Sequence, residues 1–378
     1  MNNYTQKKRV LHIIASMADG GAQRVVYDFI KRKSELKEYE LYFLSLSGAK
    51  KSTYDLSIKK NNMEFKYLNI PTYDKSSNFF CKVIGIFRDM LSIYEYVKSL
   101  QLDIIHTHMS GIIRNMIFEF MCFDGKKYHT MHSDPYSCSK LQVFFCKLAF
   151  HCLNVHPIAV GEMQRRKAIE RYGLSDCDLL RNSVDIKFIQ ESVRELDKTA
   201  LRKKYNLPEN AVLIGSVGRL HPVKNFDGLL KIFVEYKKKN TNSCLVIAGE
   251  GQEKQHLLSL ASSLGVAESV FLIGNIPLNE IYAFYKALDI FVMTSRTEAA
   301  PMVFLEAQAV GVRCVVANSI DKDMVFMSNV ICMPSDASIN DWCTAFENRD
   351  YINSNVRDSR EFDLNTVMAR LEAIYNKY

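Results

Sequence analysis

The sequence predicts an α/β protein made of two doubly wound, Rossmann-like domains. Short runs rich in Val and Ile alternate with longer amphipathic stretches, and this rhythm starts again near residue 212 after a charged segment. Short apolar runs between helices are typical of strands in a parallel sheet that is covered on both faces. At 378 residues the chain has the length of two ordinary domains.

Each half contains its own set of expected strands. The runs in the first half lie at 10–15, 39–46, 103–109, 127–132 and 156–161, with helical patterns at 22–33, 79–100 and 111–123. The runs in the second half lie at 212–218, 244–249, 270–274, 290–295 and 314–318. We place the domains at 1–185 and 186–378, with the charged segment 182–208 at the boundary. The last expected helix, 364–377, is a candidate for packing back on the first domain.

The composition predicts a cytoplasmic protein without a membrane span. Hydrophobic residues make up 48% and charged residues 24% of the chain, as in soluble globular proteins. The N-terminal apolar run holds about six residues, too few for a signal peptide. The most apolar long stretch, 141–160, is interrupted by Lys147, His151 and His156. The ten cysteines include no Cys-x-x-Cys, so neither a zinc site nor a redox pair is indicated.

The positive charge is concentrated in the first half of the chain. Residues 1–185 carry 27 Lys and Arg against 19 Asp and Glu, a net charge of +8, whereas residues 186–378 carry 22 against 23, a net charge of −1. This asymmetry indicates an anionic partner, either a membrane surface or an acidic ligand, although an ordinary lysine-rich surface gives the same count.

Two segments suggest that the partner is a membrane. Segments 79–88 and 140–147 mix large apolar side chains with cations, namely Lys82, Arg88, Lys140 and Lys147. On a helix such residues can enter the headgroup region of an anionic bilayer. We therefore expect a peripheral protein on the inner face of the cell membrane; the alternative is that the phenylalanines belong to the core.

Two cations follow the first expected strand of the second half. Arg219 and Lys224 lie five residues apart in a strand-to-helix loop, directly after Gly218. Cations beside a helix N-terminus can hold a diphosphate through charge and backbone N–H groups together. The alternative is a solvated loop with chance basic residues.

A pair of glutamates follows the expected strand at 290–295. Glu298 lies in the loop, Pro301 suits the first turn of the next helix, and Glu306 falls about five residues inside that helix among apolar neighbours. A carboxylate on an apolar face rarely lacks a partner, and a ribose diol offers two donors to one carboxylate. The alternative is a surface glutamate that helps to cap the helix.

Together these motifs resemble the EX7E signature of retaining GT-B glycosyltransferases, in particular family 4. The similarity covers most of the chain, in order and at the family's spacings. Its further motifs are Gly20-Gly21-Ala22 after the first strand, the strand ends 103–108 and 129–132, Asn182-Ser-Val-Asp185, and Gly249-Glu-Gly251. The resemblance implies the GT-B fold, with two Rossmann-like domains facing across a cleft.

The resemblance also implies roles for individual residues. Arg219 and Lys224 would bind the donor diphosphate, Glu306 the ribose hydroxyls and Glu298 hydroxyls of the transferred sugar. His132 would approach the sugar near its anomeric carbon, although a buried, satisfied histidine at a strand end is the alternative. The remaining donor-binding positions are Gly21, Ala22, Gly218, Asn275, Ala300, Pro301, Met302, Val303 and Phe304.

By the same resemblance, the reaction is a front-face substitution that retains the anomeric configuration. We expect a hexose or N-acetylhexosamine to pass from a UDP-sugar to a glycan or a polyprenyl-diphosphate-linked acceptor, in assembly of O-antigen or capsule. Neither Asp176-Cys-Asp178 nor Asp321-Lys-Asp323 follows the right kind of strand for a metal motif, so we expect no metal. Ala299 replaces the glycine that is usual in the family, a departure that bears on the local backbone and on the choice of sugar.

Two other functions fit the same fold. One is a GT-B sugar-nucleotide 2-epimerase, which should lack this set of cations and glutamates. The other is a non-catalytic subunit that binds a sugar nucleotide, against which the intact set also counts. The sequence lacks a P-loop, a dinucleotide-binding G-x-G-x-x-G after a strand, and a recognisable nucleic-acid module.

Overall fold

The computed structural model describes residues 7–70 and 79–378, with side chains from residue 84 onward in the second range, and it forms two compact units. The first contains the chain up to Asn182 together with Asn365–Tyr378, and the second contains Ser183–Leu364. The boundary proposed from the sequence lies three residues from this division. The C-terminal helix α14 (Leu364–Lys377) belongs to the first unit apart from its first residue.

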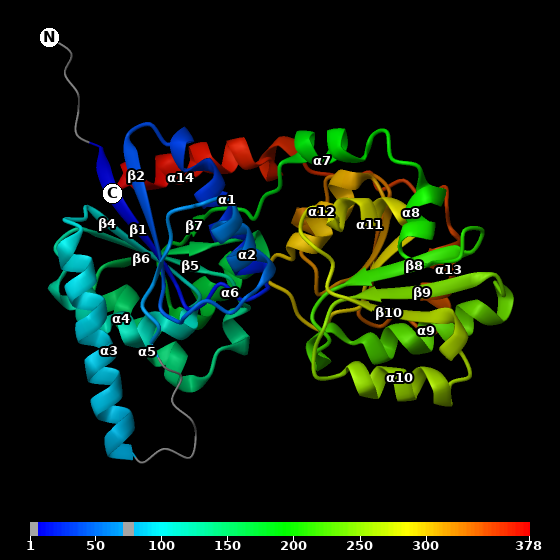
Figure 1. Cartoon of the computed structure of the whole chain (residues 1–378), viewed down its shortest axis with the longest axis horizontal. Helices are drawn as coiled ribbons and strands as arrows, with labels where there is room; N and C mark the ends of the chain where they lie inside the picture. The colour runs from blue at the N-terminus through cyan, green and yellow to red at the C-terminus, as the bar shows by residue number, and fades with distance from the viewer. Residues whose placement is uncertain (1–6, 71–78) are drawn as a thin grey trace, which may run out of the picture. The chain divides into compact units, whose positions relative to one another are not determined.

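The first unit is built on a parallel sheet of seven strands (Figure 1). Their spatial order is β3-β2-β1-β4-β5-β6-β7, so the direction of winding reverses between β1 and β4. The strands are β1 (Lys8–Ile14), β2 (Tyr39–Ser45), β3 (Lys66–Tyr67), β4 (Ile104–His108), β5 (Lys126–Met131), β6 (Val155–Ala159) and β7 (Asp178–Leu179).

Within the described residues seven helices flank this sheet, and the last of them comes from the C-terminal part of the sequence. They are α1 (Gly21–Arg32), α2 (Thr53–Lys60), α3 (Phe79–Ser99), α4 (Ile113–Cys122), α5 (Lys140–Cys152), α6 (Glu162–Tyr172) and α14. Helix α14 is fastened to the sheet by side chains of β2 and β5: the Tyr39 hydroxyl donates to Asn376, and the Tyr128 hydroxyl to the carbonyl of Ile374. The side chain of Tyr375 is fully buried.

The second unit contains a parallel sheet of six strands in the order β10-β9-β8-β11-β12-β13. The strands are β8 (Val212–Val217), β9 (Ser243–Ala248), β10 (Val270–Gly274), β11 (Ile290–Met293), β12 (Arg313–Ala317) and β13 (Val330–Met333). Its helices are α7 (Ile186–Val193), α8 (Lys198–Lys204), α9 (Phe226–Lys239), α10 (Lys254–Ser263), α11 (Ile281–Ala287), α12 (Met302–Val310) and α13 (Ile339–Glu347). The winding reverses between β8 and β11, and ligands of such sheets bind beyond the carboxyl ends of the strands at this point.

All ten strands expected from the sequence are present, within two residues at most ends. Three further strands escaped prediction: β3 and β7 have two residues each, and β13 has four. Helices α7 and α8 lie in the predicted domain boundary, where the high charge of the segment masks their short apolar faces in the sequence. The predicted two-domain α/β architecture is confirmed.

Candidate active site

Two loops meet at the switch point of the second sheet. The loop after β8 leads through a short 3-10 helix, Pro222–Lys224, and the loop after β11 leads to α12. Backbone and side-chain hydrogen bonds join them: the Arg296 N–H donates to the carbonyl of Val223 at 2.8 Å, and the Asn225 amide donates to that of Thr294 at 3.2 Å. The cation and carboxylate motifs of the sequence therefore lie in one fixed assembly.

Lys224 and Glu298 form an ion pair across this junction. Lys224 Nζ lies 2.6 Å from Glu298 Oε1, and the two side chains are only 20% and 13% exposed. The lysine stem passes Gly218, where a Cβ would lie 3.4 Å from Lys224 Cε. The sequence placed these two residues in one site but did not predict that they bind each other.

Arg219 is the second cation of the loop. Its side chain is exposed, and it makes no ion pair with any residue in the described ranges. The backbone beside it is crowded, because a Cβ on Gly249 would collide with the carbonyl oxygen of Gly218. Glycine after β9 is therefore what lets the two loops approach each other closely.

Asn275 lies at the edge of the same assembly. It is exposed and follows Gly274, whose φ of +75° favours glycine. The Gly249 N–H donates to the carbonyl of Gly274 at 2.7 Å, so the loops after β9 and β10 are joined as well.

Helix α12 begins at the end of the second loop. Pro301 occupies the N-cap position, one residue before the first turn in which we expected it, and Ala300 and Met302 are buried beside it. The Phe304 N–H bonds back to the carbonyl of Pro301 at 3.2 Å, whereas Val303 is half-buried. The other N–H groups of this first turn, on Met302 and Val303, have no partner within the helix, and such groups attract anions.

Glu306 lies inside α12 and is 5% exposed. The hydroxyl of Tyr285, on the neighbouring helix α11, donates to Glu306 Oε2 at 3.2 Å. Burial, together with the Glu306 carboxylate, holds the pKa of Tyr285 well above its usual value, so the tyrosine stays a donor. The sequence predicted a partner for Glu306 but missed Tyr285; a tyrosine within an apolar helix was the available signal.

Gly21 and Ala22 begin helix α1 in the first unit. Gly20 and Gly21 are exposed, and Ala22 is buried. The Gln23 amide donates to the carbonyl of Ser16 at 3.1 Å, which ties the loop after β1 to the helix start. The first turn of α1 thus presents free N–H groups at the carboxyl end of the first sheet.

His132 follows β5 and contacts a group of buried histidines. Its Nε2 lies 3.0 Å from His108 Nδ1, whereas its Nδ1 is buried and has no hydrogen-bond partner among the described residues. Burial lowers the pKa of His132 to about 3, so the imidazole is neutral at physiological pH. The sequence singled out His132 but not the histidines behind it.

The two Asp-x-Asp sequences serve structural contacts. Asp176 and Asp178 pair with Lys377, and Asp323 pairs with Arg357 at 2.8 Å. Asp321 caps the short 3-10 helix Lys322–Met324.

Comparison with known proteins places this geometry in a class. Residues 197–329 match the family described as "Glycosyl transferases group 1". The chain is 23% identical over 337 residues to the putative glycosyltransferase EpsF of Bacillus subtilis, covering 84% of this chain and 80% of that protein. It is 27% identical over 265 residues to an Escherichia coli UDP-Gal:alpha-D-GlcNAc-diphosphoundecaprenol alpha-1,3-galactosyltransferase, covering 63% and 64%.

Solved structures share the whole fold. Sucrose-phosphate synthase from Thermosynechococcus elongatus has a TM-score of 0.77 at 14% identity, covering 98% of this chain and 99% of that one. HepE from Anabaena, in complex with UDP, has a TM-score of 0.74 at 15% identity, covering 98% and 100%. The protein is an enzyme of the GT-B glycosyltransferase class. The segment that matches the group 1 glycosyl transferases, residues 197–329, lies within the second unit.

Proposed function

We propose that this enzyme transfers a hexose or N-acetylhexosamine from a UDP-sugar to a glycan or polyprenyl-diphosphate-linked acceptor, with retention of anomeric configuration. The acceptor class is that of surface polysaccharide assembly, as in the E. coli galactosyltransferase and in an E. coli O-antigen biosynthesis glycosyltransferase that is 23% identical over 311 residues. The observation that carries the proposal is the Lys224–Glu298 pair beside the exposed Arg219 at a sheet switch point.

The ion pair suggests how the donor is received. In the structure the charge of Lys224 is neutralised by Glu298. A diphosphate brings more negative charge than one carboxylate and would draw Lys224 and Arg219 to itself. Glu298 would then be free to accept hydrogen bonds from hydroxyls of the transferred sugar. Because the developing charge lies on the leaving diphosphate, the two cations and the α12 N-terminus would supply most of the catalysis.

The comparisons favour this transfer over the two alternatives. The named relatives are glycosyltransferases, and neither an epimerase nor a binding subunit is favoured by them. The cationic residues already provide the charge that a metal would supply, so we expect turnover to persist in EDTA. NMR of the product should show the donor's anomeric configuration; inversion, or activity that depends on added manganese, would contradict the proposed mechanism.

Thermal unfolding with UDP, GDP, ADP and their sugar conjugates tests the donor. A ligand at a hundred times its Kd stabilises the native state by about 2.7 kcal/mol. For a unit of this size that corresponds to roughly 5 °C or more in Tm. We expect the shift with UDP compounds, and expect Lys224→Ala to abolish it. Lys231→Ala, an exposed lysine on α9, is the matched control. A shift with GDP or ADP compounds alone would overturn the choice of nucleotide.

We further propose that the first unit associates with an anionic membrane. No helix in the described ranges is long and apolar enough to cross one. Exposed apolar side chains instead gather on three packed helices of this unit: Ile84, Phe87 and Leu91 on α3, Met121 on α4, and Leu141 and Phe144 on α5. Phe87, Met121 and Phe144 are each about 60% exposed or more, which excludes them from the core.

Cations share the faces of these apolar residues. Arg88 lies four residues after Ile84, so the two share a face of α3. Phe144 lies four residues after Lys140 and three before Lys147, so these three share a face of α5. All three cations are exposed. Each basic residue near an anionic surface contributes about 1 kcal/mol. Side chains of residues 79–83, including Lys82, lie outside the part that the structure describes.

Liposome co-sedimentation tests this surface. Wild type should bind vesicles containing anionic phospholipid at low salt, and Arg88, Lys140 and Lys147 changed together to Glu should abolish binding. The control carries the same charge change on the second unit, at the exposed Lys187, Lys203 and Lys238. Binding that is equal in both triple variants, or that is absent at low salt, would refute the membrane proposal while leaving the transferase proposal intact.

A further inference from the structure

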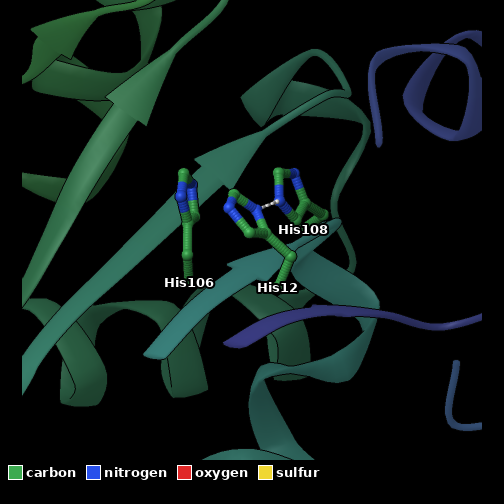
Figure 2. A group of neighbouring side chains, drawn as sticks. All are labelled: His12, His106 and His108. Atoms are coloured by element: carbon green, nitrogen blue, oxygen red, sulfur yellow. Dashed lines mark hydrogen bonds between the residues drawn. The ribbon is translucent and has the colours of Figure 1, made fainter. Parts of the chain in front are cut away.

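A continuous chain of hydrogen bonds runs behind His132 through the first unit. From His132 it passes to His108 at 3.0 Å and on to His12 at 2.9 Å. His12 Nε2 then lies 3.3 Å from the hydroxyl of Tyr375, which lies 2.6 Å from His106 Nδ1. The chain ends where His106 Nε2 meets Thr130 Oγ1 at 2.7 Å. Figure 2 shows its centre, with His12 and His108 joined.

The sheet itself places these residues. His106 and His108 are two apart on β4, so their side chains lie on the same face. His12 on the neighbouring β1 is in register with His106. Tyr375 comes from α14, which covers this face, and it lies 269 residues after His106 in the sequence. Each of His12, His106 and His108 is 1% exposed or less.

The ring nitrogens in this hydrogen-bond chain all have partners, except at the His132 end. Every ring nitrogen of His12, His106 and His108 has a partner within it. His132 Nδ1 alone is left without one among the described residues. A neutral imidazole has one N–H donor and one acceptor nitrogen, so fixing the direction of one bond between the histidines fixes the other bonds between them.

The distances at Tyr375 select the direction. A hydroxyl that donates makes shorter hydrogen bonds than an N–H group. The 2.6 Å contact to His106 therefore is the one in which Tyr375 donates, and at 3.3 Å it accepts from His12 Nε2–H. His12 Nδ1 must then accept from His108, and His108 Nδ1 must accept from His132 Nε2–H.

We propose that Tyr375 is a positioning residue that sets this proton order and holds His132 as the Nε2–H tautomer, with Nδ1 as a hydrogen-bond acceptor. Burial also lowers the pKa of each of the four histidines in this hydrogen-bond chain, so all four are neutral. His132 Nδ1 is consequently a hydrogen-bond acceptor, and the neutral imidazole does not act as a cation for phosphate. Only the catalytic meaning of that acceptor rests on the proposed function.

The tautomer can be observed directly in the full-length protein without substrate. Long-range ¹H–¹⁵N spectra of protein labelled at histidine distinguish protonated from bare ring nitrogens, and loss of signals in His132→Gln assigns them. We expect a protonated Nε2 and a bare Nδ1 at His132. In Tyr375→Phe we expect mixed tautomers. Tyr128→Phe is the matched control, because its hydroxyl is equally buried and bonds to α14 but lies outside the chain.

Several outcomes would overturn the proposal. A protonated Nδ1 at His132 in the wild type reverses the proton order, and an unchanged spectrum in Tyr375→Phe removes the role of Tyr375. Stoichiometric zinc in the purified protein would also refute it, because a metal would take the lone pairs of His12, His106 and His108. Should Tyr375→Phe fail to fold, Thr130→Val removes the acceptor at the other end and should mix the tautomers likewise.

Measurements of kcat and of the Tm shift separate this inference from the proposed function. Tyr375→Phe should lower kcat by about tenfold or more, while the Tm shift given by a nucleoside diphosphate on the second unit stays unchanged. An inactive wild type with the inferred tautomer would refute the transferase reaction alone. Full kcat in Tyr375→Phe with mixed tautomers would refute the positioning role alone.

Discussion

The buried histidines make the first unit sensitive to acid. Burial lowers the pKa of His12, His129 and His132 to about 3 each, against 6.5 in an unfolded chain. It also lowers those of His106 and His108 well below 6.5. Because the folded pKa lies below the unfolded one, the stability from these groups is complete above pH 6.5. It is lost as the pH falls from 6.5 towards 3.

The size of the loss follows from linkage. At pH 5, protonation of one such histidine in the unfolded state lowers the free energy of unfolding by about 2 kcal/mol. His12, His129 and His132 together therefore lower it by about 6 kcal/mol. Glu119 opposes them, because burial raises its pKa to about 8, and its protonation between pH 7.5 and pH 5 restores about 3 kcal/mol. The net loss is about 3 kcal/mol, and His106 and His108 add to it. A domain of roughly 5–15 kcal/mol stability stays folded at pH 5 after this loss, but it should unfold at a lower urea concentration than at pH 7.5.

The single tryptophan provides the assay. Trp342 lies on α13 in the second unit, so its fluorescence reports that unit, whereas far-ultraviolet circular dichroism reports both. Titration from pH 7.5 to 4.5 in moderate urea should show loss of dichroism before any change in Trp342. Coincident transitions would refute the reasoning, as would a free energy of unfolding that is independent of pH between 6 and 5.

Four further outcomes are expected. Glu119→Gln removes a buried carboxyl with a pKa of about 8, so it should stabilise the first unit at pH 7.5 by up to about 4 kcal/mol in urea unfolding. It should also make the stability of this unit fall more steeply with acidification, and no gain in stability would contradict the raised pKa of Glu119. Arg219→Ala or Lys224→Ala should each cut kcat at least about a hundredfold with circular dichroism unchanged, and near-normal turnover would remove the diphosphate assignment. Glu298→Gln should bind free nucleoside diphosphate more tightly in calorimetry, since Lys224 is released, yet turn over more slowly; weaker binding would show that the pair stays closed. Glu306→Ala should weaken free diphosphate and sugar nucleotide equally, and a loss seen only with the sugar attached would argue against a ribose contact.

The parts of the fold that the sequence revealed are those encoded locally. A strand of five or more apolar residues between helices is visible in the chain, and so is a cation or carboxylate directly after it. Strands β3 and β7 have two residues each, and they exist only because a neighbouring strand supplies their hydrogen bonds. The ion pair of Lys224 with Glu298 depends on the strand order that places β8 beside β11, which no local pattern contains.

The histidine chain shows the same limit more sharply. His106 and His108 alternate visibly along a strand, but alternation alone fits a buried strand without function. What turns them into a directed chain is Tyr375, whose hydroxyl arrives on a helix from the other end of the sequence. That helix is bound to the sheet through Tyr39, Tyr128 and Lys126 as well. The last turn of α14 therefore completes the hydrogen-bond chain behind His132. A truncation before Tyr375 should release the fixed tautomer of His132 while every donor-loop residue of the second unit stays in place.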